Sequence, residues 1–218
     1  MLDLEFSHAA APGHSAEDRL FVSEFRFPPQ SQPRRSTGGI WLFAMADVAH
    51  RREDPTLDLL VHGFRDAPAQ QSAGVTFSRL FQDANLQAGL PLPAHSGVVA
   101  CGLCFDRVVV AHSGGAGCYL VRQRHATRLT LSNVDVIDYQ VQPGDVLILG
   151  GETMHQAVKG SEMAAIAGHG ADLKMATHRL LELALEREPR RGMSLAAIRV
   201  LAVEKSTQAR GRAQVGRL

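Results

Sequence analysis

The sequence predicts an α+β fold in which two mainly antiparallel sheets form a sandwich flanked by helices. Three observations support this prediction: apolar runs of strand length lie near both ends and in the middle of the chain, apolar residues recur at three- and four-residue spacing in two segments, and a further helical stripe precedes the last apolar run. The resulting order is strands, two helices, a meander of strands, a helix and a final strand. This order is typical of a sheet sandwich that is covered by helices.

The first half of the chain is expected to contribute three strands and two helices. Residues 4–6 and 20–27 are rich in alternating apolar and aromatic side chains, and residues 40–45 form an apolar run after two glycines. Residues 56–64 and 75–86 carry apolar side chains at helical spacing, which places them on one face of each helix. We therefore expect these two helices to cover a sheet.

The second half is expected to form a meander followed by one helix and one strand. Five short strands fit between residues 97 and 149, and antiparallel pairing is the simplest arrangement because turn signals separate them. Asp172 is a suitable N-cap for a helix that must end before Pro189, since proline cannot continue a helix. Residues 195–203 then form a buried final strand. The turn signals of the meander are Asp106-Arg107, residues 114–117, Ser132-Asn133 and Pro143-Gly144.

Length and composition predict one domain. The chain has 218 residues, of which 45% are hydrophobic, so it is able to bury one substantial core. We expect residues 1–204 to form this domain. Residues 205–218 contain basic side chains, no acidic side chain and little apolar content, which predicts a basic, disordered tail.

Charge and cysteine content exclude several classes of protein. With 23 basic against 22 acidic residues the formal net charge is +1, so no general electrostatic attraction favours nucleic acid or an anionic membrane. No apolar stretch approaches the roughly 20 residues that a membrane-spanning helix needs, and the first residues lack the pattern of a secretory signal. The 3 cysteines, an odd number, do not make a disulfide framework. We expect a cytoplasmic protein that binds neither nucleic acid nor membranes.

Short motifs follow one another along most of the chain in a recognisable order. They are Glu17-Asp18-Arg19, Met45-Ala46-Asp47, Val110-Ala111-His112 with Gly114, Tyr119-Leu120, and the strand that opens on Pro143-Gly144-Asp145. In this order they resemble the metal-dependent protein phosphatases of the PPM type, which are protein phosphatase 2C-like. Each motif is weak alone, and the specificity of the resemblance lies in the order of the motifs, which extends over residues 4–203.

The resemblance implies a four-layer α-β-β-α sandwich with two divalent metal ions, manganese or magnesium, at one end of the sheets. Such hard cations need several oxygen ligands, and a water held between them attacks the phosphorus of a phosphoserine or phosphothreonine. The available carboxylates are Asp18, Asp47 and Glu152, each at or next to the end of an apolar strand, where they are able to converge. The short segment between Arg122 and Asp145 implies that the family's flap is reduced or absent.

Several residues that the resemblance leads one to expect are missing. Ser194 stands where the family has its last metal-binding aspartate, and Gly115 replaces the aspartate of a Gly-Asp-Ser-Arg turn. Residues 13–16 contain no arginine, although the family holds the substrate phosphate with a guanidinium near this point. Glu152 is one methylene longer than the aspartate it replaces. The loss of ligands together with the phosphate anchor predicts a metal site that is vestigial or weak, in a domain that no longer catalyses.

Structural interpretations compete with the metal-site interpretation at each position. Asp18 is able to form a surface ion pair with Arg19, which contributes little stability. Asp47 is able to cap the segment that follows it, and Glu152 to be an exposed loop residue. The glycines in residues 114–117 form either a tight turn or a cradle in which backbone amides bind an anion.

Three functions remain open. The favoured one is a pseudophosphatase, a binding or regulatory module in serine/threonine phosphorylation signalling, which contacts a phosphoprotein, a kinase or another signalling protein through the face around Asp18, Asp47 and Glu152. The alternative is an active Mn- or Mg-dependent serine/threonine protein phosphatase with these acids as metal ligands. The third is a redox or metal-binding module built on Cys101 and Cys104, although residues three apart in a strand face opposite sides, which favours small core residues instead.

Overall fold

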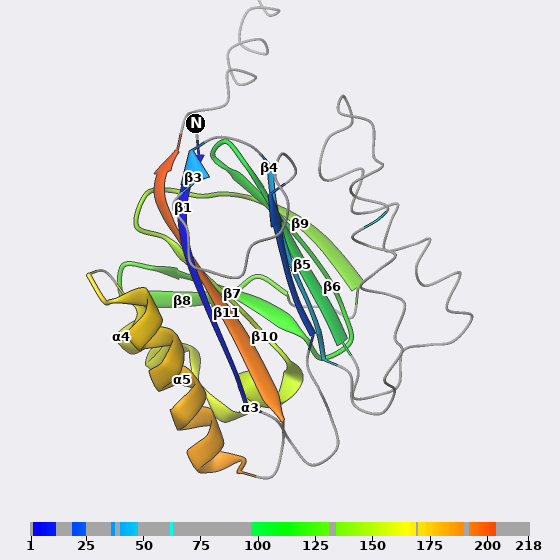
Figure 1. The fold of residues 1–218 in the computed structure, drawn as a ribbon, viewed down its shortest axis with the longest axis vertical. Helices are drawn as coiled ribbons and strands as arrows, with labels where there is room; N and C mark the ends of the chain where they lie inside the picture. The colour runs from blue at the N-terminus through cyan, green and yellow to red at the C-terminus, as the bar shows by residue number, and fades with distance from the viewer. Residues whose placement is uncertain are drawn as a thin grey trace, which may run out of the picture.

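Two antiparallel sheets stacked on each other form the body of the protein, and helices cover the outer face of one of them (Figure 1). The structure is a computed structural model, which describes residues 2–11, 19–24, 36–37, 40–47, 62, 97–130, 134–168, 170–189 and 192–203. The predicted α+β sandwich of two mainly antiparallel sheets is confirmed.

The six-stranded sheet brings together strands from both ends of the described chain. The order of its strands is β3-β1-β11-β10-β7-β8. Strand β1 pairs antiparallel with β11, and the paired residues extend from Leu2↔Val203 to Ala11↔Met193. The bounds are β1 Leu2–Ala11, β3 Ser36–Thr37, β7 Gly117–Arg122, β8 His125–Arg128, β10 Val146–Gly150 and β11 Met193–Val203. β1 and β11 extend beyond the predicted ranges 4–6 and 195–203, because each strand supplies the backbone partners of the other along its whole length.

The five-stranded sheet has the order β2-β4-β5-β6-β9. Strands β4, β5, β6 and β9 therefore lie side by side in the order in which they occur along the chain. The bounds are β2 Arg19–Glu24, β4 Ile40–Asp47, β5 Gly97–Cys104, β6 Arg107–Ser113 and β9 Val134–Gln140. The meander predicted between residues 97 and 149 is therefore divided between the two sheets: β5, β6 and β9 lie in one, and β7, β8 and β10 lie in the other.

The hydrophobic core between the sheets consists of alternate side chains of the facing strands. Val99, Cys101 and Leu103 of β5 oppose Leu147 and Leu149 of β10, and all five are buried. The residues of β10 that alternate with these pack against the helices on the other face of the sheet. Because both faces of β10 are covered, its sequence is apolar at every position, with no alternation between apolar and polar residues.

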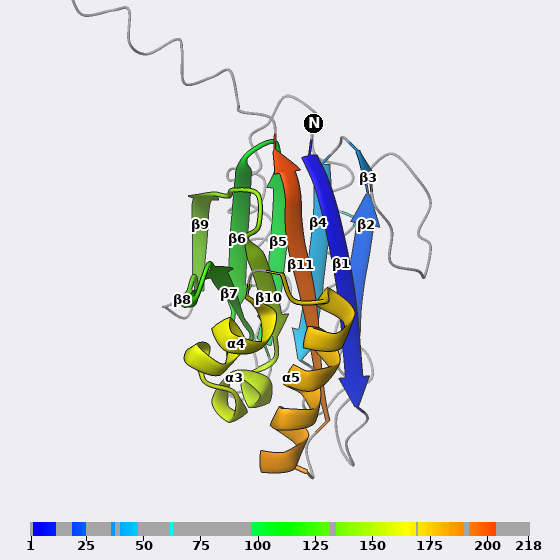
Figure 2. The ribbon, with the colours of Figure 1, turned by 90° about the vertical axis from the view of Figure 1, so that its left-hand side faces the viewer.

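Three described helices cover the outer face of the six-stranded sheet, as the side view shows (Figure 2). They are α3 Glu152–Ala157, α4 Gly160–Ala167 and α5 Leu173–Arg187. The predicted helix after Asp172 is confirmed as α5: the Asp172 carboxylate accepts a hydrogen bond from the backbone N–H of Met175 at 2.8 Å, and the helix ends before Pro189.

The expectation that Glu152 is an exposed loop residue is wrong. Glu152 is the first residue of α3 and is partly buried. Neither α3 nor α4 is expected from the sequence, because helices of 6 and 8 residues are too short to show a repeated stripe. Burial of Met154 and Met163 on the sheet stabilises these helices by contacts that local sequence does not show.

Other expectations fall largely outside the described residues. The predicted helices 56–64 and 75–86, which would form the second outer layer, contain only one described residue, His62, which is helical. The predicted tail, residues 205–218, is not described at all, and neither is most of the segment 25–39 between two strands. None of the helices that the structure describes is both long and apolar enough to cross a membrane.

Candidate functional site

Two of the sequence-predicted acids lie at the same end of the sandwich. Asp47 is the last residue of β4, and its Cα pairs with that of Gly97, the first residue of β5. A Cβ placed on Gly97 would lie 2.4 Å from the backbone nitrogen of Ala116, so β5 begins in direct contact with the turn between β6 and β7. The same turn contacts Glu152 through Gly115. We call Asp47, Gly97, residues 114–117 and Glu152 the Glu152 end of the sandwich.

Asp18 itself lies outside the described residues. The strand that follows it, β2, starts at Arg19, whose Cα pairs with that of Ala46 near the end of β4. The chain therefore enters β2 at the Glu152 end. The backbone of Asp47 is described, whereas its side chain is not, so the convergence of the three carboxylates stays a prediction.

The Glu152 side chain packs directly on Gly115. A Cβ placed on Gly115 would lie 2.6 Å from the Cβ of Glu152 and 2.7 Å from its Oε2, distances at which real Cβ atoms are not found. On its other side the Glu152 Oε1 accepts a hydrogen bond from Gln156 Nε2 at 2.8 Å, one helical turn along α3. Because Gly115 has no side chain, it leaves the space that the Glu152 side chain occupies.

A partly buried histidine, His155, lies beside the same turn on the helix side of the sheet, and both of its ring nitrogens are buried. Gly117 of β7 pairs with Gly150 of β10, and the His155 ring covers both glycines. A Cβ on Gly117 would lie 3.1 Å from the Nε2 of His155, and one on Gly150 would lie 3.2 Å from its Cε1. The ring also contacts Tyr119, with ring centroids 5.2 Å apart. The two paired glycines are therefore needed to accommodate the imidazole.

Burial lowers the pKa of His155 to about 4, and the nearby positive charge of Arg128 adds to the lowering, while the carbonyl groups of Gly117 and Gly150 partly offset it. The imidazole is neutral at physiological pH. The burial of the His155 ring is not predictable from the sequence, because it depends on the packing of helix α3 on the sheet. The available signal was the position of Gly117 and Gly150 at the ends of two apolar strands.

Ser194, where the resemblance leads one to expect an aspartate, is buried at the beginning of β11. Its Oγ lies 3.2 Å from the Sδ of Met45, on β4 of the opposite sheet. Met45 precedes Asp47 by two residues on the same strand. Ser194 thus presents a small hydroxyl side chain that packs across the sandwich, and it offers no carboxylate to a metal ion.

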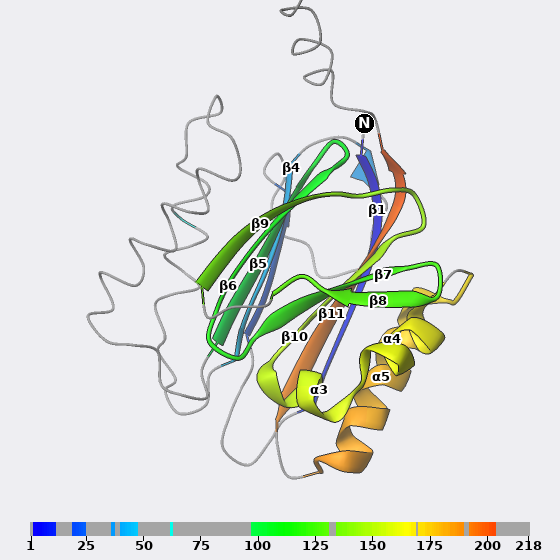
Figure 3. The ribbon, with the colours of Figure 1, turned by 180° about the vertical axis from the view of Figure 1, so that it is seen from behind.

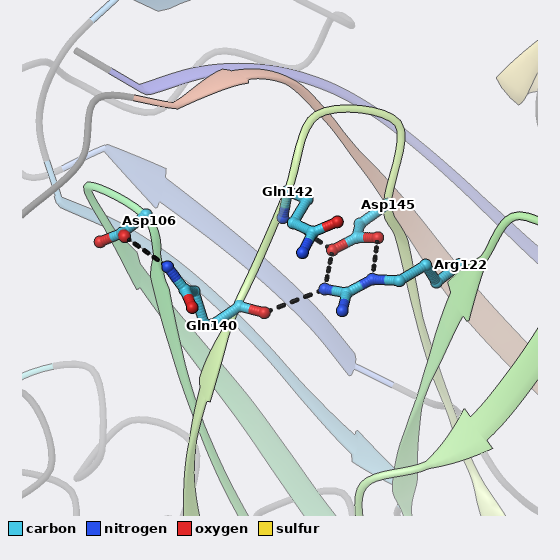
Figure 4. Close-up of polar contacts among 5 residues, drawn as sticks. All are labelled: Asp106, Arg122, Gln140, Gln142 and Asp145. Atoms are coloured by element: carbon cyan, nitrogen blue, oxygen red, sulfur yellow. Dashed lines mark hydrogen bonds and ion pairs between the residues drawn. The ribbon is translucent and has the colours of Figure 1, made fainter.

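The opposite end of the sandwich holds a structural network (Figure 4). The buried Asp145 carboxylate accepts hydrogen bonds from Arg122 Nε at 2.8 Å and Nη2 at 2.7 Å, and from the backbone N–H of Gln142 at 2.8 Å. Arg122 Nη2 also donates to the carbonyl of Gln140 at 3.0 Å, and Gln140 Nε2 donates to Asp106 Oδ2 at 2.9 Å. Arg122 and Gln140 belong to different sheets, so the network fastens one sheet to the other.

Cys101 faces another cysteine across the core. Its Sγ lies 3.8 Å from the Sγ of Cys118 on the opposing sheet, and both side chains are fully buried. Burial, together with the contact with Cys118, raises the pKa of the Cys101 thiol, which opposes formation of a reactive thiolate. Cys101 and Cys104 lie three residues apart in β5, as the sequence predicts. The interpretation of Cys101 and Cys118 as small core residues agrees with these contacts.

The side chains that are described do not form a metal centre by themselves. No three histidine, cysteine, aspartate or glutamate side chains among them lie close enough together to hold a metal ion. Glu152 is the one predicted ligand whose side chain is described, and two of its contacts are with Gly115 and Gln156. A manganese or magnesium ion needs more oxygen ligands than this single carboxylate. No catalytic step through a metal follows from this part of the chain.

Comparison with solved structures decides the fold. The serine/threonine phosphatase of Streptococcus agalactiae superposes with a TM-score of 0.68 at 16% sequence identity, and the match covers 90% of this chain and 99% of that one. The fold is that of the PPM-type phosphatases. The serine/threonine phosphatase PstP/Ppp of Mycobacterium tuberculosis gives a TM-score of 0.67 at 12% identity, covering 92% of this chain and 100% of that one. No family model matches the sequence, and a search of curated proteins finds no significant match.

A further structure of this fold contains metal ions. The catalytic domain of the phosphatase PstP in complex with 2 manganese ions gives a TM-score of 0.65 at 14% identity, and the match covers 93% of this chain and 100% of that one. The metal belongs to that protein. For the present chain, these comparisons show the PPM-type phosphatase fold.

Proposed function

We propose that this protein is a pseudophosphatase, a cytoplasmic binding or regulatory module in serine/threonine phosphorylation signalling. The PPM-type fold supports the connection with phosphorylation signalling. The Glu152 end of the sandwich supports the loss of catalysis, because two positions that carry aspartates in the family hold Gly115 and Ser194.

The packing of Glu152 on Gly115 is the observation that carries this proposal. Restoring an aspartate at position 115 would place its Cβ 2.6 Å from the Cβ of Glu152. The two substitutions relative to the family are therefore complementary: the longer acid uses the space that the glycine leaves. A site that retained its metal ligands would need the space around Glu152 for ions and water, whereas here protein atoms fill it on the side of the turn.

The proposed partner is a phosphoprotein, a kinase or another signalling protein, which contacts the face around Asp18, Asp47 and Glu152. A related fold occurs in PppA, described as a key regulatory component of a secretion system in Pseudomonas aeruginosa, with a TM-score of 0.63 at 15% identity. A pseudophosphatase binds its partner without hydrolysing a phosphate ester. Asp18, Asp47 and Glu152 then hold manganese or magnesium weakly or not at all.

Titration and turnover distinguish this function from an active phosphatase. Manganese is titrated calorimetrically into wild type, Asp47→Ala and Glu152→Ala, with Glu182→Ala on the exposed face of α5 as the matched control. We expect weak heat or none, and no hydrolysis of an aryl phosphate with manganese or magnesium. Turnover that Asp47→Ala abolishes and Glu182→Ala leaves intact would establish the Mn- or Mg-dependent serine/threonine phosphatase instead.

The binding role is tested by surface variants of the same face. Glu152→Lys should abolish capture of the cognate signalling protein, whereas the exposed control Glu182→Lys should capture it as wild type does. Equal capture by both variants would refute the assignment of this face as the binding surface.

A further inference from the structure

Strand β8 forms one edge of the six-stranded sheet and is joined to β7 by a tight hairpin. The two-residue turn is Gln123-Arg124, in which Gln123 has a φ of 57°. Figure 3 shows this hairpin reaching outward beside α4. No other strand among the described residues pairs with the outer side of β8. An edge strand of this kind presents backbone groups to which an added strand is able to bond.

The register of the hairpin identifies the backbone groups that point outward. Leu120 pairs with Thr127 and Val121 with Ala126, and the N–H of Leu129 donates to the carbonyl of Cys118 at 2.9 Å. Hydrogen-bonded and non-hydrogen-bonded pairs alternate along an antiparallel ladder. The residues of β8 that are not bonded to β7 are therefore Ala126 and Arg128, and their N–H and C=O groups point away from the sheet.

The charge beside this edge is mainly positive, with one acid nearby: the Glu162 carboxylate accepts a hydrogen bond from the backbone N–H of Lys159 at 2.9 Å and interacts with the Lys159 charge. Arg124, Arg128 and Lys159 have exposed side chains, and none of them takes part in an ion pair with a described residue. The elements that pack against β8 are β7 and α4, and the one acid on them is Glu162. Arg187 already binds Glu162, with Nη2 at 2.6 Å and Nη1 at 2.8 Å from the two carboxylate oxygens.

Two of these cations border the same face of β8. Arg128 pairs with Tyr119, and Ala126 with Val121, on the helix side of the sheet. Gly160 packs on this side, because a Cβ placed on it would lie 3.5 Å from the Cβ of Ala126 and 3.6 Å from Cε1 of Tyr119. Lys159, which precedes Gly160 as the N-cap of α4, is thus close to the helix side of the β8 edge.

We propose that the β8 edge is a docking surface for an extended, acidic segment of a partner protein, which adds to the sheet as a further strand. The partner's backbone would bond to Ala126 and Arg128, and its acidic side chains would meet Arg128 and Lys159 on the helix side and Arg124 at the turn. Charge complementarity favours carboxylates over a basic segment. The inference deepens the proposed binding function, although it requires neither Asp47 nor Glu152 and no metal ion.

The docked segment would lead toward the Glu152 end of the sandwich. Arg128 Nε lies 3.5 Å from the Oγ1 of Thr130, and a Cβ on Gly117 would lie 2.6 Å from the same oxygen. Gly117 is the first residue of β7 and directly follows the turn that contacts Glu152. A partner bound along β8 is therefore guided from the hairpin turn toward the proposed binding face.

Fluorescence anisotropy of a labelled synthetic peptide, in which glutamate alternates with threonine, tests the proposal in the presence of EDTA. We expect saturable binding to the whole protein that weakens with salt, since the Debye length falls from about 10 Å at 0.1 M to about 3 Å at 1 M salt. Arg128→Glu with Lys159→Glu should weaken binding about tenfold. The control Lys174→Glu, an exposed lysine on α5, should leave binding unchanged.

Two further arms separate strand addition from general charge attraction and from misfolding. A peptide of the same sequence with alternate backbone nitrogens methylated should lose binding, and the double variant should bind a lysine-threonine peptide better than wild type does. No binding of the acidic peptide, or equal binding of its methylated form, would overturn the proposal and leave the cations as a device that keeps the edge from aggregating. Preferential binding of a single-stranded oligonucleotide would overturn it as well. The binding assay contains neither phosphate nor metal. A failure of the peptide to bind would therefore not count against the proposed pseudophosphatase function, and binding of the peptide would not require that function.

Discussion

Replacing Gly115 by alanine tests whether Glu152 fills the space of a missing side chain. Gly115 does not have a positive φ, so alanine brings no backbone strain of its own. The new Cβ would meet the Cβ of Glu152 at 2.6 Å, its Oε2 at 2.7 Å and its Cδ at 2.8 Å. The carboxylate end is able to rotate away, whereas the Cβ moves only with the backbone of α3.

The expected cost follows from overpacking. Forcing an extra methyl group into a closely packed site destabilises by about 1–3 kcal/mol, and the reduced freedom of the unfolded chain offsets this by about 0.4–1 kcal/mol. Gly115→Ala should therefore lower the unfolding free energy by about 1–2 kcal/mol. Glu152→Ala retains the Cβ, so the cost should persist in that background. Glu152→Gly removes all three contacting atoms, so the cost should vanish there.

The assay is equilibrium unfolding in urea of Gly115→Ala in the wild-type, Glu152→Ala and Glu152→Gly backgrounds. The difference between the wild-type and Glu152→Gly backgrounds gives the coupling energy, which should be about 1–2 kcal/mol. Equal destabilisation by Gly115→Ala in all three backgrounds would refute the complementary packing. It would also remove the observation that supports a vestigial site.

Three other properties follow from the structure. The pKa of His155 is lowered from 6.5 to about 4 in the folded protein, so the unfolded chain binds the proton more tightly. The unfolding free energy should therefore fall by about 3 kcal/mol as the pH is lowered from 6.5 to 4. Urea unfolding should show that the unfolding free energy of His155→Gln depends less on pH across this range. Arg122→Ala leaves the Asp145 carboxylate buried without its cation and should cost about 3 kcal/mol by thermal and urea unfolding, and a cost near zero would contradict a structural role. Cys101 and Cys118 should react with iodoacetamide only as fast as the protein opens, as followed by peptide mass spectrometry; rapid labelling of the folded protein would support the redox alternative.

The order of apolar runs was sufficient to predict the sandwich, because strand-forming segments have a local signature. The run at β10 is apolar at every position, and the stripe after Asp172 has the spacing and the N-cap of a helix, so both elements were predicted with nearly correct bounds. The prediction failed at α3 and α4. Their stability depends on packing against the six-stranded sheet, which sequence spacing over so few residues does not reveal.

The metal site at Asp18, Asp47 and Glu152 stays a prediction, and the structure describes the placement of two of these residues. The positions of Asp47 and Glu152 at strand ends suggested one end of the sandwich, and the structure places the backbone of Asp47 and the Glu152 side chain there. What sequence did not show is the partner of each group: Gly115 beneath Glu152, Met45 beside Ser194, and paired glycines beneath an imidazole. These contacts join residues far apart in the chain.

By itself the sequence determined the class of fold and the helix that begins after Asp172, because periodicity and capping residues are properties of the chain before it folds. Only the tertiary structure decided that Glu152 packs on a glycine, that Cys101 faces Cys118, and that the cations of β8 lie along an open sheet edge. Such contacts depend on how two sheets and a helical layer come together in space, and strand pairing between distant segments fixes this arrangement.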